Sequence, residues 1–364
     1  MCSTRHSIFC ILPPHILRAI AERGTLEERT AASRTLAVDS TFRAMRAAPM
    51  AFAAPPPTFA VQPAAKQRTI YTANNLQQLP GTAVATEQNP PTASADAAIV
   101  EAFDGLGATW DFYFDVFDRQ SIDDEGMPLN ATVHYGNRYN NAFWNGQQMV
   151  FGDGDGRLFK RFTIALDVIG HELTHGVTQD EAQLQYMFQS GALNESMSDV
   201  FGSLIKQKKN GDTTRSADWL IGEGLFTSEV NGQALRSMKA PGTAYSDPVL
   251  GDDPQPDHMS KYVNTYDDNG GVHINSGIPN RAFYLAAYAF DGYAWEKAGR
   301  IWYETLRDSA LRPTTGFKRF AKLTVSTAGR LFGPGSVEQE IVADAWATVG
   351  LSVSATAVAV PLRA

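Results

Sequence analysis

The chain has 364 residues, of which 43% are hydrophobic, and this is enough apolar material for two domains. Its net charge of −8 and the lack of a basic cluster exclude a nucleic-acid-binding surface. No stretch approaches the roughly 18 consecutive apolar residues of a membrane-spanning helix. We therefore expect no nucleic-acid or membrane partner, and we expect a monomer.

The N-terminal segment does not have the pattern of a signal peptide. Its apolar run at residues 8–12 ends at Pro13, whereas a secretory core needs about 7–15 apolar residues. Residues 16–22 and 26–45 then have the spacing of short, charged amphipathic helices. This segment is therefore expected to fold rather than to direct export by a recognisable signal.

Residues 47–65 are rich in Ala and Pro, which predicts a stiff, exposed linker that is suited to cleavage. Cys2 and Cys10 are the only cysteines, and both precede this linker. The rest of the chain therefore has no disulfide bonds, and cysteine usage does not indicate whether the protein is exported.

The two halves of the chain after the linker differ in pattern. Residues 69–156 combine Gly, Asn and aromatic residues with short alternating runs, which predicts strands, and one helix is predicted over 96–118. Farther along, helical spacing recurs in five segments: 192–209, 276–291, 293–311, 315–330 and 336–349. The predicted fold class is α+β, with a β-rich N-terminal half and a helical C-terminal half.

A His-Glu-x-x-His pattern lies at residues 171–175, between these halves. Residues four apart share one face of a helix, so His171 and His175 can point their imidazoles at a single zinc ion. Glu172 lies about 100° round the helix, close to the metal without being forced to bind it. A carboxylate there can take a proton from a zinc-activated water, whose pKa falls towards about 7.

A second predicted helix supplies the remaining ligand. Zinc that performs chemistry needs a third protein ligand and an open fourth position. Glu195 and Asp199 are four apart beside an apolar stripe, where acids are costly unless a cation meets them. Glu195 can complete a two-His, one-Glu site, and Asp199 can accept the other ring N–H of a ligand histidine. We place Asn194 with Asp199 among the groups that support the ligands.

Several motifs, in one order along the chain, resemble those of the thermolysin family of zinc metalloproteases. They are Tyr-Asn-Asn-Ala-Phe-Trp-Asn-Gly (139–146), Gly-Asp-Gly-Asp-Gly (152–156), His-Glu-Leu-Thr-His (171–175), Gly-Ala-Leu-Asn-Glu (191–195) and Asp-Asn-Gly-Gly-Val-His-Ile-Asn-Ser-Gly (268–277). The short leader resembles the protealysin-like branch in particular. The resemblance implies a zinc endopeptidase that cleaves proteins and peptides on the N-terminal side of hydrophobic residues.

The resemblance also implies a zymogen. Residues 1–50 are similar to a short propeptide that acts as an intramolecular inhibitor, and residues 13–17 are similar to a motif of such leaders. We expect the linker at 51–66, an N-terminal catalytic half with the zinc helix at 67–186, and a helical half at 187–352. A leader cysteine can cap the zinc, although an ordinary free thiol is the simpler interpretation. We expect secretion without a recognisable signal peptide, with a cytoplasmic protein that awaits release as the alternative.

The same resemblance implies which residues stabilise the oxyanion that forms from the scissile carbonyl. The oxyanion of a tetrahedral species needs donors that are placed in advance. By resemblance, His273 is the acid or oxyanion donor and Tyr186 is the second donor. Asp268 is the partner that holds the His273 imidazole protonated and oriented.

Substrate recognition is implied as well. An extended peptide can pair with an edge strand, and the Asn141 side chain and the Ala142 carbonyl are expected to face it. Arg236 resembles the arginine that binds the carbonyl after the scissile bond, with a structural salt bridge as its alternative role. Five residues match positions that line the family's specificity pocket, although they can equally be ordinary core residues: Phe159, Phe162, Val168, Ile221 and Leu235. Because Phe162 is bulkier than the common leucine, we expect cleavage before Leu, Ile or Val over cleavage before Phe.

The double calcium site that is typical of the family is altered. Asp167, Asp218 and Glu223 match its acids, but Lys206 and Leu220 stand where two more acids are expected. An ammonium group can neutralise a carboxylate cluster, and the loss of two acids weakens calcium binding. We therefore expect one catalytic zinc and at most one calcium, or Lys206 in place of both calcium ions.

Three alternatives remain open. A zinc aminopeptidase shares the metal motif, but 19 residues separate His175 from Glu195, one more than in that relative, and the acidic motif for a free amine is absent. A non-catalytic peptide-binding relative is expected to lose Glu172 or a ligand first, and none is missing. The leader alone can also act as a peptidase inhibitor, in which case it stays bound after cleavage.

Overall fold

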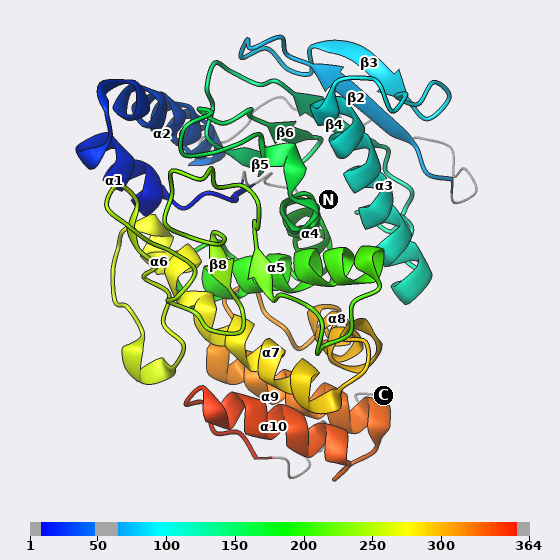
Figure 1. Ribbon diagram of the computed structural model, residues 1–364. Coiled ribbons are helices and arrows are strands. Elements are labelled where there is room, and N and C mark those ends of the chain that lie inside the picture. The colour runs from blue at the N-terminus through cyan, green and yellow to red at the C-terminus, as the bar shows by residue number, and fades with distance from the viewer. Residues whose placement is uncertain (1–8, 48–64, 355–364) are drawn as a thin grey trace.

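The computed structural model describes residues 9–47 and 65–354, and a mixed β-sheet organises its N-terminal half (Figure 1). The strands follow the order β1-β5-β6-β4-β2-β3 across the sheet. β4 pairs parallel with both β2 and β6, and all other neighbours are antiparallel. The strands are β1 (Phe9–Cys10), β2 (Arg68–Thr72), β3 (Thr82–Thr86), β4 (Leu129–Val133), β5 (Ala142–Trp144) and β6 (Met149–Phe151).

The N-terminal segment supplies the edge strand β1 and then two helices, α1 (Pro14–Arg23) and α2 (Leu26–Ala47). These confirm the two helices predicted in this segment. Pro14 occupies the first position of α1, where its fixed φ and missing N–H favour the start of a helix. We call residues 9–47 the leader below. Cys2 and the predicted linker up to residue 64 lie outside the described residues.

The predicted helix over 96–118 is confirmed as α3 (Ala97–Phe117), which packs against β2 and β4. Its first turn is capped by Asp96, whose side chain accepts a hydrogen bond of 2.8 Å from the Ala98 N–H. The apolar side of α3 contributes large aromatic residues to the core, and the helix also contacts the zinc-motif helix. The zinc-motif helix therefore packs against both α3 and the sheet.

Two helices cross closely at the centre of the molecule, α4 (Leu166–Glu181) and α5 (Phe188–Asn210) (Figure 1). Glycines allow this approach: a Cβ on Gly202 would lie 2.4 Å from the Asp167 carbonyl oxygen, and one on Gly170 would lie 3.1 Å from the Gly202 Cα. The crossing brings the face of α4 that carries residues 171 and 175 against the first turns of α5.

The C-terminal half is helical, as predicted, and packs below α5 in Figure 1. It contains α6 (Asp268–Asn275), α7 (Gly277–Phe290), α8 (Arg300–Leu306), α9 (Phe317–Phe332) and α10 (Val337–Thr348). The single helix expected over 293–311 is wrong: a π-helical turn (Trp295–Gly299) precedes α8, and α8 ends at Leu306. α6 was not predicted as a separate element. Left-handed backbone at Asn269, Gly270 and Gly271 bends its start.

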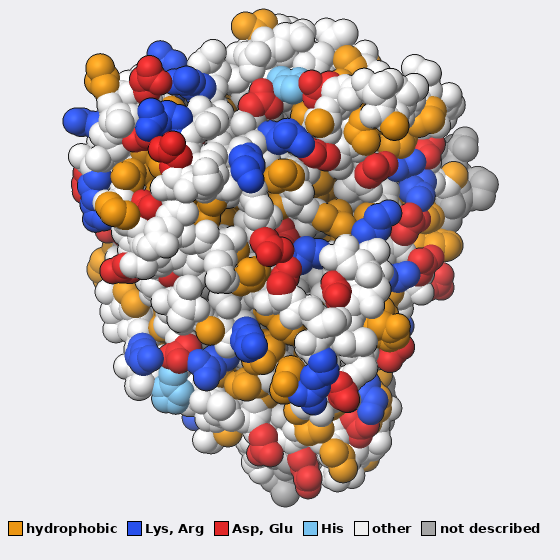
Figure 2. Space-filling view, in the orientation of Figure 1, with side chains coloured by type: hydrophobic (Ala, Val, Ile, Leu, Met, Phe, Trp, Pro, Cys, Tyr) orange, Lys and Arg blue, Asp and Glu red, His pale blue; other side chains and the backbone are white. Residues whose placement is uncertain are grey.

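Charged side chains are spread over the visible surface rather than gathered by sign. Figure 2 shows Lys and Arg interspersed with Asp and Glu on the face seen in Figure 1. Many of them form ion pairs, for example Arg138 with Glu27 of the leader at 3.0 Å. Within the described ranges, none of the helices has the length and apolarity required to cross a bilayer.

Candidate active site

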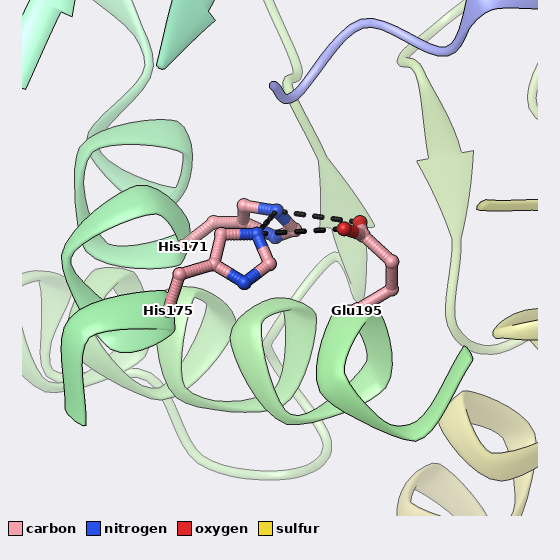
Figure 3. A group of neighbouring side chains, drawn as sticks. All are labelled: His171, His175 and Glu195. Carbon is pink, nitrogen blue, oxygen red and sulfur yellow. Dashed lines mark hydrogen bonds and ion pairs between the residues drawn. The ribbon is translucent and has the colours of Figure 1, made fainter. Parts of the chain in front are cut away.

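Two histidines of α4 and one glutamate of α5 converge on a single point (Figure 3). The Nε2 atoms of His171 and His175 lie 3.0 Å apart. Glu195 places Oε2 3.5 Å from the first nitrogen and Oε1 3.4 Å from the second. All three side chains are fully buried. The two oxygen–nitrogen distances are longer than those of a close ion pair, and the nitrogen and oxygen atoms face one common point.

The donor set fits zinc. Glu195 Oε2 is buried without a hydrogen-bond partner, and a buried carboxylate is costly unless a cation compensates it. Burial, and then the neighbouring His171, lower the pKa of His175 well below its usual value, so its imidazole is neutral and can donate a lone pair. Two imidazole nitrogens and one carboxylate oxygen are the ligands of a catalytic zinc site with an open position.

Each ligand histidine is oriented through its other ring nitrogen. His171 Nδ1 lies 2.8 Å from Asp199 Oδ1, and His175 Nδ1 lies 2.7 Å from Asn194 Oδ1. With Nδ1 as the donor, both Nε2 atoms face the metal point as acceptors. The Ser198 hydroxyl lies 3.0 Å from the same His175 nitrogen. Sequence reasoning missed Ser198, although it stands one helical turn after Asn194 on α5.

Asp199 is itself held by several donors. Arg236 makes two hydrogen bonds to its carboxylate, at 2.9 and 2.8 Å, and Asn280 donates a third at 2.8 Å. Burial raises the pKa of Asp199, but Arg236 and His171 outweigh it, and the pKa falls below its usual value. Asp199 therefore stays ionised beside the ligand histidine. Asn280, far along the chain on α7, gave no local signal in the sequence.

Glu172, the residue after the ligand His171, lies against strand β5. The Trp144 N–H donates a hydrogen bond of 3.1 Å to its Oε2, while Oε1 is buried without a partner. Burial, and then the charge of Glu195, raise the pKa of Glu172 well above its usual value. A carboxylate with a raised pKa beside a metal site is suited to accept and return a proton.

His273 and Tyr186 lie beside the Glu195 carboxylate. His273 Nε2 lies 3.2 Å from the Tyr186 hydroxyl and 3.6 Å from Glu195 Oε2, and the Tyr186 hydroxyl also contacts Glu195. The bend in α6 lets Asp268 reach His273 twice, through the backbone N–H at 2.9 Å and through Nδ1 at 2.7 Å. Burial lowers the pKa of His273, but Asp268 and Glu195 raise it more.

The leader lies beside this cluster. β1 pairs antiparallel with β5, and the Ile11 N–H donates to the Ala142 carbonyl at 3.2 Å. The Leu12 N–H donates to Asn141 Oδ1 at 3.0 Å. Arg236 donates to the Ile11 carbonyl at 3.1 Å, in addition to the salt bridge with Asp199 that was considered as its alternative role.

Helix α2 also binds residues 139–141, which lead into β5, and sequence reasoning missed this contact. The buried Asp39 carboxylate accepts hydrogen bonds from the Tyr139 hydroxyl at 2.6 Å and from the Asn141 amide at 2.9 Å. Thr35 accepts one from the Asn140 N–H at 3.1 Å. The sequence contained an indication of this contact. Ala31, Thr35 and Asp39 are spaced four residues apart, which places two polar side chains on the packed face of an amphipathic helix.

The leader thiol lies away from the metal point. Cys10 is buried in a small cluster with Tyr135, Tyr139, Phe143 and Val150. The group of metal-ligating side chains found within the described residues consists of His171, His175 and Glu195, without a thiol. The idea that Cys10 caps the zinc is therefore wrong in this conformation: its carbonyl, not its sulfur, faces the catalytic side.

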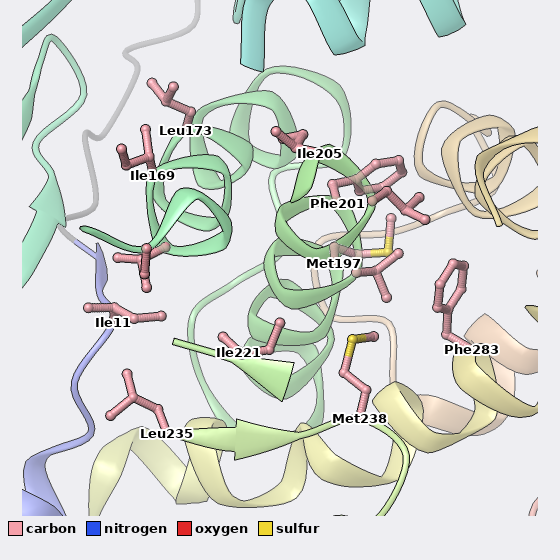
Figure 4. Packing of buried hydrophobic residues seen from close by; sticks show 14 of the residues in the cluster. Ile11, Ile169, Leu173, Met197, Phe201, Ile205, Ile221, Leu235, Met238 and Phe283 are labelled. Carbon is pink, nitrogen blue, oxygen red and sulfur yellow. The ribbon is translucent and has the colours of Figure 1, made fainter. Parts of the chain in front are cut away.

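The five predicted pocket residues are all buried in one hydrophobic cluster that also contains Ile11. In Figure 4, Ile11 lies between Leu235 and helix α4, with Ile221 beside it. Phe162 is fully buried and lies near Phe159, with ring centroids 5.9 Å apart. The leader thus places an aliphatic side chain beside Leu235 and Ile221, two of the residues that the sequence assigned to a specificity pocket.

Lys206 lies within the predicted acidic cluster. Its ammonium group is 2.8 Å from Asp167 and 3.0 Å from Asp218, and it donates a 2.8 Å hydrogen bond to the Leu220 carbonyl. Burial lowers the pKa of Lys206, but the two aspartates raise it above its usual value. Glu223 lies beside Asp218, and burial together with this neighbour raises the pKa of Glu223.

Comparison with known proteins agrees with this geometry. Residues 50–179 match the thermolysin metallopeptidase catalytic domain, and residues 182–351 match its α-helical domain. The chain is 52% identical to an extracellular metalloprotease of Pectobacterium carotovorum subsp. carotovorum over 95% of this chain and 97% of the relative. It is 53% identical to the protease PrtS of Photorhabdus sp. (strain Az29) over 79% and 76%.

A solved structure is also similar. The precursor of protealysin, a metalloproteinase from Serratia proteamaculans, superposes with a TM-score of 0.85 at 52% identity, over 94% of this chain and all of that one. The family matches cover both halves of the fold, and the described zinc-ligand triad lies where they meet. The chain therefore belongs to the thermolysin family of zinc metallopeptidases, in its protealysin-like branch.

Proposed function

We propose that this zinc metalloendopeptidase cleaves peptide bonds on the N-terminal side of aliphatic residues and is held latent by its own leader. The observation that carries the proposal is the set of contacts to the leader backbone. Ala142, Asn141, Arg236 and His273 each bind a main-chain group of residues 10–12, beside the metal ligands. Groups that bind a backbone regardless of its side chains are suited to peptide substrates in general.

The proposed chemistry divides among the residues around the metal point. Zinc held by His171, His175 and Glu195 supplies a Lewis acid that activates water and polarises a carbonyl. Glu172 accepts the proton of the attacking water and returns it to the leaving amine. His273 and Tyr186 donate hydrogen bonds to the developing oxyanion.

Asp268 keeps the His273 ring oriented, and Asp199 and Asn194 keep the ligand histidines oriented. The backbone contacts then hold the scissile carbonyl near these groups. Such positioning turns the attack of water into an effectively intramolecular step, which lowers its barrier.

The proposed pocket consists of the aliphatic and aromatic residues around Ile11. Phe162 takes up volume that a leucine would leave open, so we propose that Leu, Ile and Val after the scissile bond are preferred over Phe. A shorter aliphatic side chain fills such a pocket without displacing packed neighbours, whereas overpacking costs about 1–3 kcal/mol.

We further propose that residues 1–50 form the propeptide and 51–66 the linker that is cut on maturation. Residues 67–186 and 187–352 then form the two halves of the mature enzyme. Relatives named extracellular metalloprotease support a secreted protein, and we propose that it acts as a monomer. Lys206 takes the place of calcium in the cluster with Asp167, Asp218 and Glu223.

The Glu172→Ala variant tests the proposed roles. Metal analysis after dialysis is expected to find one zinc per chain, as in the unmodified enzyme, while kcat on a blocked apolar peptide falls by about 10³-fold or more. The exposed Glu340→Ala serves as the matched control and is expected to keep full activity. Retained activity in Glu172→Ala would contradict the assignment. A substrate requirement for a free α-amine would instead favour an aminopeptidase.

A further inference from the structure

One peptide bond of the leader is bound on its carbonyl side by a catalytic residue of the proposed mechanism and on its nitrogen side by a proposed substrate-binding residue. His273 Nε2 lies 3.0 Å from the Cys10 carbonyl oxygen. On the other side of this bond, the Ile11 N–H donates to the Ala142 carbonyl at 3.2 Å. The carbonyl thus meets the proposed oxyanion donor, and the nitrogen meets the backbone acceptor that is proposed to bind substrate.

The next backbone groups fix the register of the leader in the cleft. Arg236 binds the Ile11 carbonyl, and Asn141 Oδ1 accepts from the Leu12 N–H. Pro13 follows, and because proline has no N–H it cannot replace Leu12 at Asn141 if the chain shifts by one residue. Helix α1 begins at Pro14, so the extended part of the leader ends there. A one-residue shift is therefore disfavoured on this side.

Side-chain burial favours the same register. Ile11 is fully buried in the large core cluster with Leu235 and Ile221 (Figure 4), whereas Cys10 is buried in a separate cluster. Successive residues of a strand point to opposite faces, and a slip of one residue would exchange these two side chains. Ile11 would then leave the proposed pocket for the site of a smaller thiol.

We infer that the Cys10–Ile11 bond lies in the position of a scissile bond, and that the enzyme cleaves its own leader there. This inference rests on the proposed function. In the reaction the oxygen of water joins the Cys10 carbonyl carbon, the C–N bond breaks, and a proton passes to the Ile11 nitrogen. The products are a carboxylate at Cys10 and a new amino terminus at Ile11.

The cut leader remains in place because other contacts hold it. The segment after Ile11 continues into α1 and α2, where Asp39 binds Tyr139 and Asn141 and where Glu28 pairs with Arg157 at 3.0 Å. These contacts lie downstream of the cut, so cleavage does not release them. The leader is thus an internal substrate whose larger product still covers the cleft.

The first experiment uses the zinc-loaded full chain. The second incubates the matured enzyme with a blocked peptide of residues 7–14, and both are done under reducing conditions. Mass spectrometry is expected to find an amino terminus at Ile11 in the chain, and cleavage of the peptide between Cys10 and Ile11. Ile11→Asp is expected to abolish both, whereas Leu26→Asp, at an exposed leader position, leaves the chain cut normally. Binding of the peptide to a Glu172→Gln enzyme is expected to weaken roughly ten- to hundredfold with Ile11→Asp.

Two results would overturn the inference while leaving the proposed function intact. One is an enzyme that cleaves a reference apolar peptide but leaves the octapeptide whole, even if the octapeptide inhibits it. The other is cleavage at a different bond, which means a different register. An enzyme that does not cleave the reference peptide either refutes the proposed function itself, and the inference with it.

Discussion

Asn141 and Asp39 are 102 residues apart in the chain, yet the Asn141 amide donates a 2.9 Å hydrogen bond to the Asp39 carboxylate. The other end of the same side chain, Oδ1, accepts from the Leu12 N–H. Asn141 is therefore bound by two separate parts of the leader, the extended segment at Leu12 and helix α2 at Asp39. We therefore expect latency to depend on this helix contact as well as on the contact of Leu12.

Replacement of Asp39 by Asn is expected to loosen the leader. The substitution removes the negative charge and one of the two oxygens that accept from Tyr139 and Asn141, and the weakening of such buried hydrogen bonds costs about 1–3 kcal/mol. In a Glu172→Gln precursor, which cannot process itself, binding of a fluorescent peptide to the cleft should strengthen roughly five- to hundredfold. The control Glu27→Gln changes an exposed ion pair of the same helix and should leave binding unchanged. Equal binding by both variants would show that Asp39 does not hold the leader.

Lys206 is expected to make folding independent of calcium. Its removal in Lys206→Ala leaves Asp167 and Asp218 facing each other without a cation, and breaking such a largely buried pair costs on the order of 3 kcal/mol. Unfolding of the unmodified protein should give the same Tm with EGTA as with calcium, while Tm of the variant should fall. Lys208→Ala removes an exposed pair with Asp115 and should cost less than about 1 kcal/mol. A large loss of Tm in EGTA for the unmodified protein would refute the replacement of calcium.

Asp268 is expected to act on catalysis through His273 alone. Asp268→Asn removes the negative charge and one of the two oxygens that accept from the His273 backbone N–H and ring, so kcat should fall by about 10- to 100-fold while zinc content and KM change little. The neighbouring Asp267→Asn is the matched control, because Asp267 is exposed and pairs only with the leader residue Arg18 among the described ion pairs. Loss of zinc from Asp268→Asn would point to a structural role instead.

The metal ligands could be predicted from the sequence because helical spacing is local. His171 and His175 share a face of α4, and Glu195 and Asp199 share a face of α5, whatever the rest of the chain does. What brings the two faces together is the close crossing at Gly170 and Gly202, a contact between separate helices that no spacing rule reports. The family resemblance supplied that step in advance.

The contacts of the leader could not be predicted in the same way. The register of the leader depends on which backbone groups of Ile11 and Leu12 meet Asn141 and Arg236. Because every residue type offers the same backbone carbonyl, and nearly every type the same N–H, the leader sequence does not indicate which residues make these hydrogen bonds. The bend of α6 was missed for a related reason: left-handed backbone at Asn269 ends one turn and starts another inside a single polar motif. Only the three-dimensional arrangement decides where such a chain turns.

His15 is a titratable leader residue that lies next to the cleft. Its Nε2 lies 3.1 Å from the Tyr245 hydroxyl, and Nδ1 is buried without a partner. Burial lowers the pKa of His15 to about 4; Asp268 opposes this, while His273, Arg236 and Arg18 add to it. The docked leader therefore binds fewer protons than the free leader, whose histidine has a pKa of about 6.5.

Docking of the leader is accordingly expected to weaken as the pH falls. The contribution of neutral His15 is fully present above pH 6.5, declines as the pH drops below that value, and is lost at about pH 4. His15→Gln keeps a polar group for Tyr245 but cannot titrate, so its docking should change less between pH 7 and pH 5. Peptide binding to the cleft of a Glu172→Gln precursor, compared at both pH values with and without His15→Gln, measures the difference. If both proteins respond equally to pH, His15 is not the group that links docking to protonation.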